Sequence, residues 1–266
     1  MGAASKTVLT GLTRSLFGLL LVVVMPMAFL QAAEFRVHTQ IFSGDGDLPV
    51  SKNTTLFSGG DAYDSIAGAA EVTVFQASEN CFYLLDLKRQ LKTRITTDEL
   101  LQYTTSLQEK ARKSQDPLLK FCAQPKFELR REKDGKMWIF FDPVLRYQIL
   151  TDTAGDEEVA KEYRRFCDWY SRLKAMLLPQ ALLPFPRLVV NERIAREAAI
   201  PKTVSLRISA QRRTEDHPVE IRSVHSLKEK LSPTDKKRVE LVQEHLATFE
   251  EATVARYRAN SQTARK

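Results

Sequence analysis

The 266-residue chain lacks every compact sequence signature that would name a reaction. It contains no GxSxG nucleophile motif, no phosphate-binding loop and no GxGxxG dinucleotide motif. It also has no HxH, HExxH or CxxC pattern, so the sequence supports neither a structural zinc site nor a thioredoxin-type redox motif. We therefore assign no catalytic, metal-ligating or cofactor-binding residue from the sequence, and we expect no cofactor.

Cysteine is scarce, since only Cys81, Cys122 and Cys167 occur. An odd number permits at most one disulfide and leaves one thiol over, and separation along the chain does not decide which pair forms. The alternative is that all three are small, buried, apolar side chains. Both possibilities stay open at the level of sequence.

A long hydrophobic run occurs once, near the N-terminus. Lys6 and Arg14 precede the apolar residues 16–25, Pro26 interrupts the run, and Ala32-Ala33 offers small residues for cleavage. This order is typical of a secretory signal peptide, so we expect residues 1–33 to be removed. The mature protein is then exported, either to a periplasm or to the medium.

An uncleaved membrane anchor is the less favoured alternative. The apolar stretch would then run from Leu16 to Leu30, about fifteen residues, whereas a bilayer core needs roughly twenty. Pro26 and Gln31 also fall where an anchor would carry aliphatic residues. In this alternative the domain would be a membrane-tethered scaffold.

The rest of the chain alternates short strands with turns. The expected strands are residues 35–42, 53–57, 62–66, 71–76, 81–85, 90–95, 127–133, 137–141, 147–150, 204–208 and 219–224. Asp134-Gly135 suits a two-residue hairpin turn between two of them. Because such short connections cannot cross over, successive strands should pair antiparallel.

Helical periodicity appears in four segments, which are residues 96–114, 159–177, 188–199 and 232–257. Thr96 and Glu99 form a capping box, and Ser232 is the expected N-cap of the last helix. Segment 159–177 has the clearest pattern, with a wide aromatic face that includes Tyr163, Phe166 and Tyr170. That face needs an apolar partner, and a sheet is the natural one.

These elements predict one α+β domain over residues 34–257. We expect a curved, mainly antiparallel, half-barrel-like β-sheet packed by three to four α-helices, followed by a disordered basic tail at 258–266. The net charge of +7 is spread over mixed signs without an aromatic-basic stripe, so specific nucleic-acid binding is not expected.

Two sets of polar residues could in principle bind metal. Four aspartates lie in two glycine-rich turns, but no glutamate closes a calcium loop at the required distance, so turn chemistry explains them better. The four histidines are isolated and are expected to be surface or hydrogen-bonded side chains. These residues are Asp45, Asp47, Asp61 and Asp64, and His38, His217, His225 and His245.

Two aromatic strands end in aspartate and are followed by a basic strand. One is residues 81–86, followed by Arg89, and the other is 138–142, followed by Arg146. This rhythm, over residues 35–95 and 127–150, resembles the lipoprotein-localisation half-barrel superfamily of periplasmic lipoprotein carriers. The resemblance implies a curved antiparallel sheet that wraps helices and can hold acyl chains on its concave side. It implies no particular binding residue.

The leading hypothesis is an exported, non-enzymatic protein that binds a lipid-like or apolar ligand or acts as a cell-envelope interaction module. It predicts a contiguous apolar groove between the concave sheet and helix 159–177. The alternative is a secreted hydrolase with an unrecognised active site. That alternative would need a nucleophile beside a base, but Cys167 borders Phe166 and Tyr170 and is better explained as core.

The signal peptide is directly testable. N-terminal sequencing of the protein recovered from its native compartment should begin at Glu34, because cleavage is expected after Ala33. A full-length species that still carries Lys6 and Arg14 would instead indicate a retained anchor.

Overall fold

The fold is taken from a computed structural model, which describes residues 1–2, 32–133, 135–153, 155–209 and 218–259. The described residues from Ala32 onward belong to one compact unit. The apolar run of the expected signal peptide, His217 and residues 260–266 of the expected tail lie outside the described residues. No helix in the described ranges is long and apolar enough to cross a membrane.

Twelve strands in the described residues form one open sheet with the order β12-β6-β5-β4-β3-β2-β1-β11-β10-β9-β8-β7. The strands are β1 (Phe35–Ser43), β2 (Ser51–Ser58), β3 (Asp61–Ile66), β4 (Glu71–Gln76), β5 (Cys81–Asp86), β6 (Leu91–Thr96), β7 (Glu128–Arg131), β8 (Met137–Phe141), β9 (Leu145–Thr153), β10 (Ala199–Ile208), β11 (Val219–Lys228) and β12 (Glu250–Glu251). All pairs are antiparallel except β12 with β6. The expected α+β class with a mainly antiparallel sheet is confirmed.

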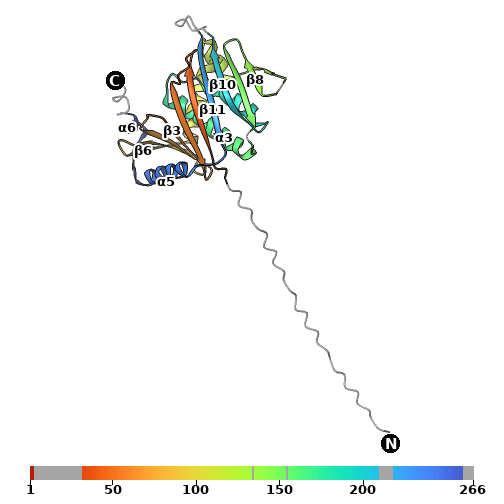
Figure 1. The fold of residues 1–266 in the computed structure, drawn as a ribbon, viewed down its shortest axis with the longest axis vertical. Helices are drawn as coiled ribbons and strands as arrows, with labels where there is room; N and C mark the ends of the chain where they lie inside the picture. Colours follow the sequence, from red (N-terminus) through yellow and green to blue (C-terminus); the bar gives the residue numbers. More distant parts are fainter. Residues whose placement is uncertain (3–31, 134, 154, 210–217, 260–266) are drawn as a thin grey trace. The chain divides into compact units, whose positions relative to one another are not determined.

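Strand β11 joins two runs of sequential hairpins. Strands β1 to β6 pair in chain order on one side, and β7 to β10 do so on the other. β11 forms the expected hairpin with β10 and also pairs with β1 along Arg36–Ser43. Figure 1 labels β3, β11, β10 and β8 in their order across the sheet, with the sheet bending between β3 and β11. The late β10–β11 hairpin therefore unites both halves of the sheet.

The helices are α1 (Thr97–Arg112), α2 (Pro117–Ala123), α3 (Glu157–Leu177), α4 (Phe185–Ala195), α5 (Pro233–Thr248) and α6 (Val254–Ala259). The capping box of Thr96 with Glu99 forms at α1 as expected, and Ser232 is the N-cap of α5 as expected. Ser232 and Asp235 also form a capping box, which was not predicted. Helices α2 and α6 were not expected. The start of α2 is nevertheless encoded, because Asp116 accepts hydrogen bonds from two backbone N–H groups and Pro117 follows it.

Several boundaries differ from the sequence prediction. Helix α4 begins at Phe185, where a bend was expected, and ends at Ala195, because residues 199–208 are already β10. Helix α5 ends at Thr248 rather than continuing to Tyr257, which belongs to α6 together with the first residues of the expected tail. Strand β7 ends at Arg131, so its connection to β8 is longer than the expected two-residue turn; Asp134 lies outside the described residues.

The aromatic face of α3 packs on the sheet, as its sequence pattern predicts. The Phe57 ring stacks on Phe35 with centroids 4.1 Å apart and meets Phe166 edge-on at 5.7 Å. Phe75, Phe82, Leu100 and Leu173 are buried in the same cluster. Rings in this geometry add to the burial energy, so this cluster is a main source of stability.

The other face of the sheet is covered over β2 to β5 by α5. Leu56, Val74 and Leu85 are buried there against Val239 and Phe249. Figure 1 shows α5 lying beside this part of the sheet. Over β9 to β11 the same face carries polar side chains, among them Gln148 of β9 and Ser205 of β10.

All three cysteines are free. Cys81 lies in β5, Cys122 in α2 and Cys167 in α3, and the first two are buried. The alternative of unpaired, mostly buried thiols is therefore the one that the structure adopts.

Replacing Phe57 by alanine should destabilise the protein by about 3–5 kcal/mol, because the change removes a fully buried ring and its stacking partners. Urea unfolding of the purified protein measures this loss. Leu101→Ala is the control, since Leu101 on α1 is 45% exposed and should change the free energy of unfolding by less than about 0.5 kcal/mol. Equal effects of the two substitutions would contradict this packing.

Candidate functional site

The candidate site begins where β10 and β11 separate. Their pairing covers Thr203–Ile208 of β10 and Val219–Val224 of β11. Beyond it, residues Ala199–Pro201 pair only with β9, and His225–Lys228 pair only with β1. The β9–β10 register shifts between Pro201 and Thr203. Proline has no N–H to donate to a ladder, which favours such an irregularity.

A cavity of about 650 Å³ lies at this separation. Its buried lining residues are apolar or aromatic and come from three elements: Val37 of β1, Tyr163 of α3, and Ile200 and Pro201 of β10. Half-buried Val224, His225 and Leu227 continue the lining along β11. Exposed Asp152, Thr153, Lys202, Ser226, Lys228 and Glu229 complete it. The cavity thus has an apolar floor and a charged rim, and its volume lies in the range of small-molecule sites.

His225 is the central polar group of this cavity. Its Nδ1 lies 3.0 Å from Thr39 Oγ1 and 3.4 Å from the Tyr163 hydroxyl, and its Nε2 lies 3.0 Å from Ser223 Oγ. The Tyr163 and His225 rings also meet at 76°. Three hydroxyl groups therefore hold the imidazole in place from α3, β1 and β11.

Burial, and next the charge of Arg187, lower the pKa of His225 to about 3. Burial raises the pKa of Tyr163 well above its usual range. At neutral pH both side chains are therefore uncharged, and the imidazole carries one N–H donor and one acceptor nitrogen. The cavity presents neutral hydrogen-bonding groups beside apolar carbon, which suits an amphiphilic ligand.

Cys167 lies one helical turn after Tyr163 and borders the same region. Burial raises the pKa of its thiol to about 12. A cysteine nucleophile requires a thiolate and a base that can hold the proton, and here both the thiol and His225 are neutral in their resting forms. The cluster does not supply the activated pair that the hydrolase alternative requires.

The groove expected along α3 is present only in part. From Phe166 to Leu177 the helix face is filled by Phe57, Leu100 and their neighbours. Open space remains beside Tyr163, near the N-terminal end of the helix. The prediction of a contiguous apolar groove is therefore wrong for the second half of α3, because the large aromatic side chains of β1, β2 and β4 fill it.

The four aspartates considered for calcium are used separately. Asp45 and Asp47 are exposed after β1, and Asp61 accepts a hydrogen bond from the Ala77 N–H at 2.8 Å. Asp64 is buried and accepts hydrogen bonds from the Thr55 and Tyr170 hydroxyls at 2.7 and 2.9 Å. Asp64 therefore links β3 to α3 through a buried hydrogen bond, whereas the sequence predicted a turn residue.

The histidines are separated as well. The His38 ring lies 3.3 Å from Thr54 Oγ1, and His245 stacks on Phe249. Within the described part of the chain, no group of three or more histidine, cysteine, aspartate or glutamate side chains is arranged to hold a metal ion.

Sequence reasoning did not single out His225. The available signal was its position in the alternating series Ser223, His225 and Leu227, which places a histidine on the buried face of a strand. The partners Thr39 and Tyr163 are 186 and 62 residues away along the chain, so no local pattern could have joined them.

No protein-family model matches this chain, and the search of curated proteins gives no match.

The neutral state of His225 is testable by NMR titration. Its ring resonances, assigned by comparison with His225→Asn, should show no midpoint between pH 8 and 4.5, because the pKa is lowered to about 3. The unfolded chain takes up this proton near pH 6.5, so stability should fall as pH decreases below about 6.5. His225→Asn should reduce that acid sensitivity. A midpoint near 6.5 in the native protein would contradict the prediction.

Proposed function

We propose that this protein is exported and binds a lipid-like, amphiphilic ligand in the His225 cavity without chemically transforming it. The observation that carries the proposal is the mixed lining at the gap between β10 and β11. Val37, Ile200 and Leu227 offer an apolar surface next to the neutral hydroxyl and imidazole groups of Tyr163 and His225. An amphiphile matches both parts, whereas a strongly polar solute would leave the floor unmatched.

The rim favours an ionic or polar headgroup. Lys202 and Lys228 are exposed at the cavity, as are Asp152 and Glu229. Charges at the mouth remain solvated when a ligand enters, so they can contact its headgroup without the desolvation cost of a buried ion pair. The acyl or other apolar part would then lie against Val37 and Ile200.

The location of the cavity agrees with the implication of the family resemblance. A half-barrel carrier holds acyl chains between its concave sheet and a helix, and the cavity here lies between β1, β10, β11 and α3. The N-terminal segment supports export. A role as a cell-envelope interaction module is compatible with the same cavity, with a lipid-bearing partner as the ligand.

The proposal is tested by native mass spectrometry of the purified protein with palmitate as probe. We expect a bound species at one palmitate per chain, since the described residues provide one cavity of this lining. A uniformly ligand-free protein that ignores palmitate would remove the lipid-binding function.

A filling substitution locates the site. Leu227→Trp should weaken palmitate binding at least about tenfold, because the larger ring occupies the cavity volume that the ligand needs. Val219→Trp is the matched control: it places the same ring on β11 at a residue that is 37% exposed and does not line the cavity. Urea unfolding verifies that both variants fold. Equal binding by the two variants would place the ligand elsewhere.

A further inference from the structure

Three arginines share the sheet face opposite the His225 cavity. Arg146 of β9 and Arg207 of β10 are directly opposite each other in the ladder. Arg222 of β11 lies opposite Ser205, which is on the same face as Arg207. The reverse face of these strands carries the buried residues Tyr147 and Val204. The register therefore gathers three guanidinium groups over adjacent strands, away from the core.

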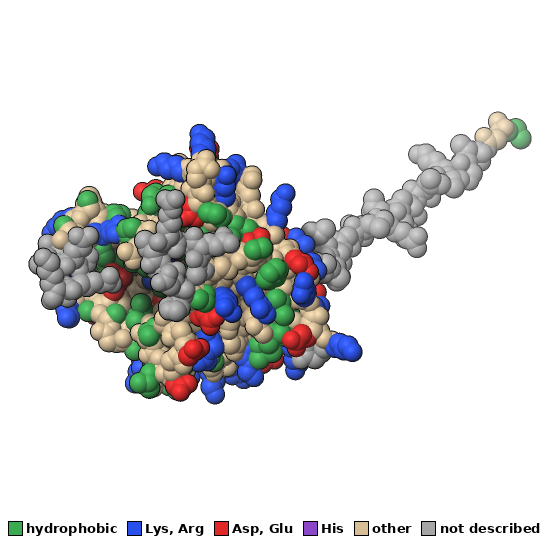
Figure 2. All heavy atoms as spheres, turned by 90° about the horizontal axis from the view of Figure 1, so that it is seen from above, with side chains coloured by type: hydrophobic (Ala, Val, Ile, Leu, Met, Phe, Trp, Pro, Cys, Tyr) green, Lys and Arg blue, Asp and Glu red, His purple; other side chains and the backbone are tan. Residues whose placement is uncertain are grey.

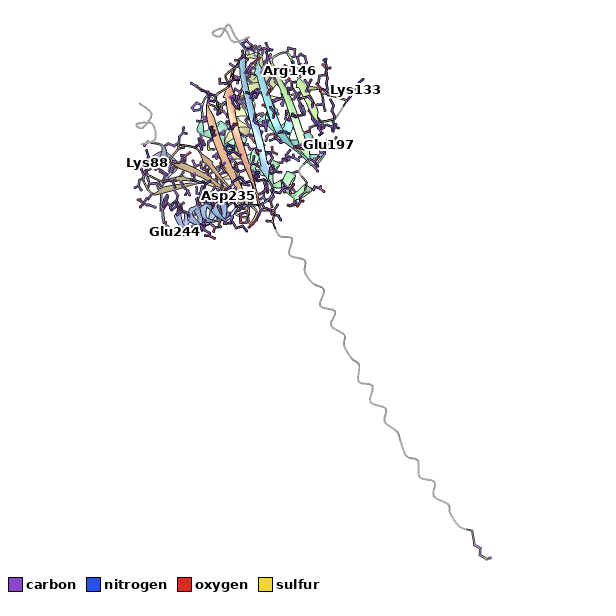
Figure 3. All side chains as sticks on the ribbon, viewed as in Figure 1. Lys88, Lys133, Arg146, Glu197, Asp235 and Glu244 are labelled. Atoms are coloured by element: carbon purple, nitrogen blue, oxygen red, sulfur yellow. The ribbon has the colours of Figure 1, made fainter. Side chains whose placement is uncertain are left out.

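These side chains line a pocket of about 480 Å³, together with Gln148, Ser205 and Glu220. Arg146 lies near the upper end of the sheet in Figure 3. Figure 2, seen from above, shows basic and acidic side chains interspersed over that face of the molecule. The pocket differs from the His225 cavity because three of its lining residues are arginines.

The donors of this pocket are only partly satisfied. Arg207 Nε forms an ion pair with Glu220 Oε1 at 3.3 Å, which partly neutralises one guanidinium. The Arg222 guanidinium carbon lies over the Phe42 ring, 4.1 Å from its centroid. A cation–π contact of this kind does not use the N–H donors of a guanidinium that lies flat on the ring. Arg146 Nε is buried and has no hydrogen-bond partner among the described residues.

The arrangement carries an energetic cost unless an anion is bound. Like charges directly opposite in a ladder repel, as Arg146 and Arg207 do, and a buried donor without a partner loses its hydration. Glu220 and Asp45 supply two carboxylates for three arginines, and Asp45 is exposed in the turn after β1. An oxyanion between the guanidinium groups would satisfy Arg146 Nε and screen the repulsion.

We propose that this pocket binds a phosphate group. Guanidinium forks bind carboxylate and phosphate oxygens in pairs, and donors approaching from three adjacent strands suit a tetrahedral phosphate better than a planar carboxylate with two oxygens. Gln148 and Ser205 add neutral donors. A soluble phosphorylated compound and a phospholipid headgroup share this chemistry. The site is independent of the amphiphile cavity, since the two lie on opposite faces of the sheet.

The test is a titration with inorganic phosphate, followed through the arginine Nε–H signals in ¹H–¹⁵N NMR spectra. The Arg146 Nε–H signal, assigned with Arg146→Gln, should shift and saturate with phosphate and stay unchanged with sodium chloride at matched ionic strength. Absence of a saturable shift would overturn the proposal.

Variants connect the signal to the pocket. Arg222→Gln should weaken phosphate binding about tenfold, the effect of one charged hydrogen-bonding group. Arg130→Gln is the matched control, because Arg130 lies on the same face, in β7, and is paired with Glu128 outside the pocket. Glu220→Gln should bind phosphate more tightly, a gain that misfolding cannot produce. Equal affinities in the Arg222 and Arg130 variants would overturn the proposal.

Vesicle flotation separates the two sources of phosphate. Binding to phosphatidylglycerol vesicles but not to phosphatidylcholine vesicles, lost in Arg222→Gln and kept in Leu227→Trp, would identify a lipid headgroup. Saturable phosphate binding without flotation would identify a soluble phosphorylated ligand. Flotation thus identifies the source of the phosphate once the titration has shown a saturable shift. The absence of that shift refutes the phosphate site and leaves the palmitate test unaffected.

Discussion

The pairing of β11 with both β1 and β10 is the interaction on which the rest of the structure depends. It joins two runs of hairpins into one sheet, and its two ladders differ in length. The ladder with β1 continues to Lys228, but the ladder with β10 stops at Val224. The missing pairing between β10 and β11 beyond Val224 opens the His225 cavity on one face of the sheet. The paired part of β11 places Arg222 on the other face. Both proposed sites therefore follow from the register of a single strand.

The packing of α3 limits what the cavity can hold. Its aromatic face closes the space under β1 and β2, so a long continuous acyl groove like that implied by the half-barrel resemblance is not available along the whole helix. A short cavity remains beside Tyr163. It exists because β10 and β11 separate there. The size of the cavity is thus set by strand separation, and its mouth is lined by charged residues.

The fold could largely be predicted from sequence because its elements are locally encoded. Alternation predicted strands such as Glu71–Gln76, a capping box predicted the start of α1, and the N-cap Ser232 predicted the start of α5. The ends were less certain: α4 stops four residues early because Ala199 enters a ladder with β9, a pairing that no local pattern reveals. Both candidate sites escaped prediction for the same reason. Thr39, Tyr163 and His225, like Arg146 and Arg222, meet only through the strand order.

The two edges of the open sheet carry a further consequence. β7 is short, and its Arg131 bridges to Glu197 and covers the Trp138 ring at 4.2 Å. At the opposite end, β6 is capped by Glu250–Glu251 of β12. Unpaired strand edges invite other chains to add on, and brief, charged borders discourage this. The short, charged borders of this open sheet therefore disfavour edge-to-edge association between copies of the chain.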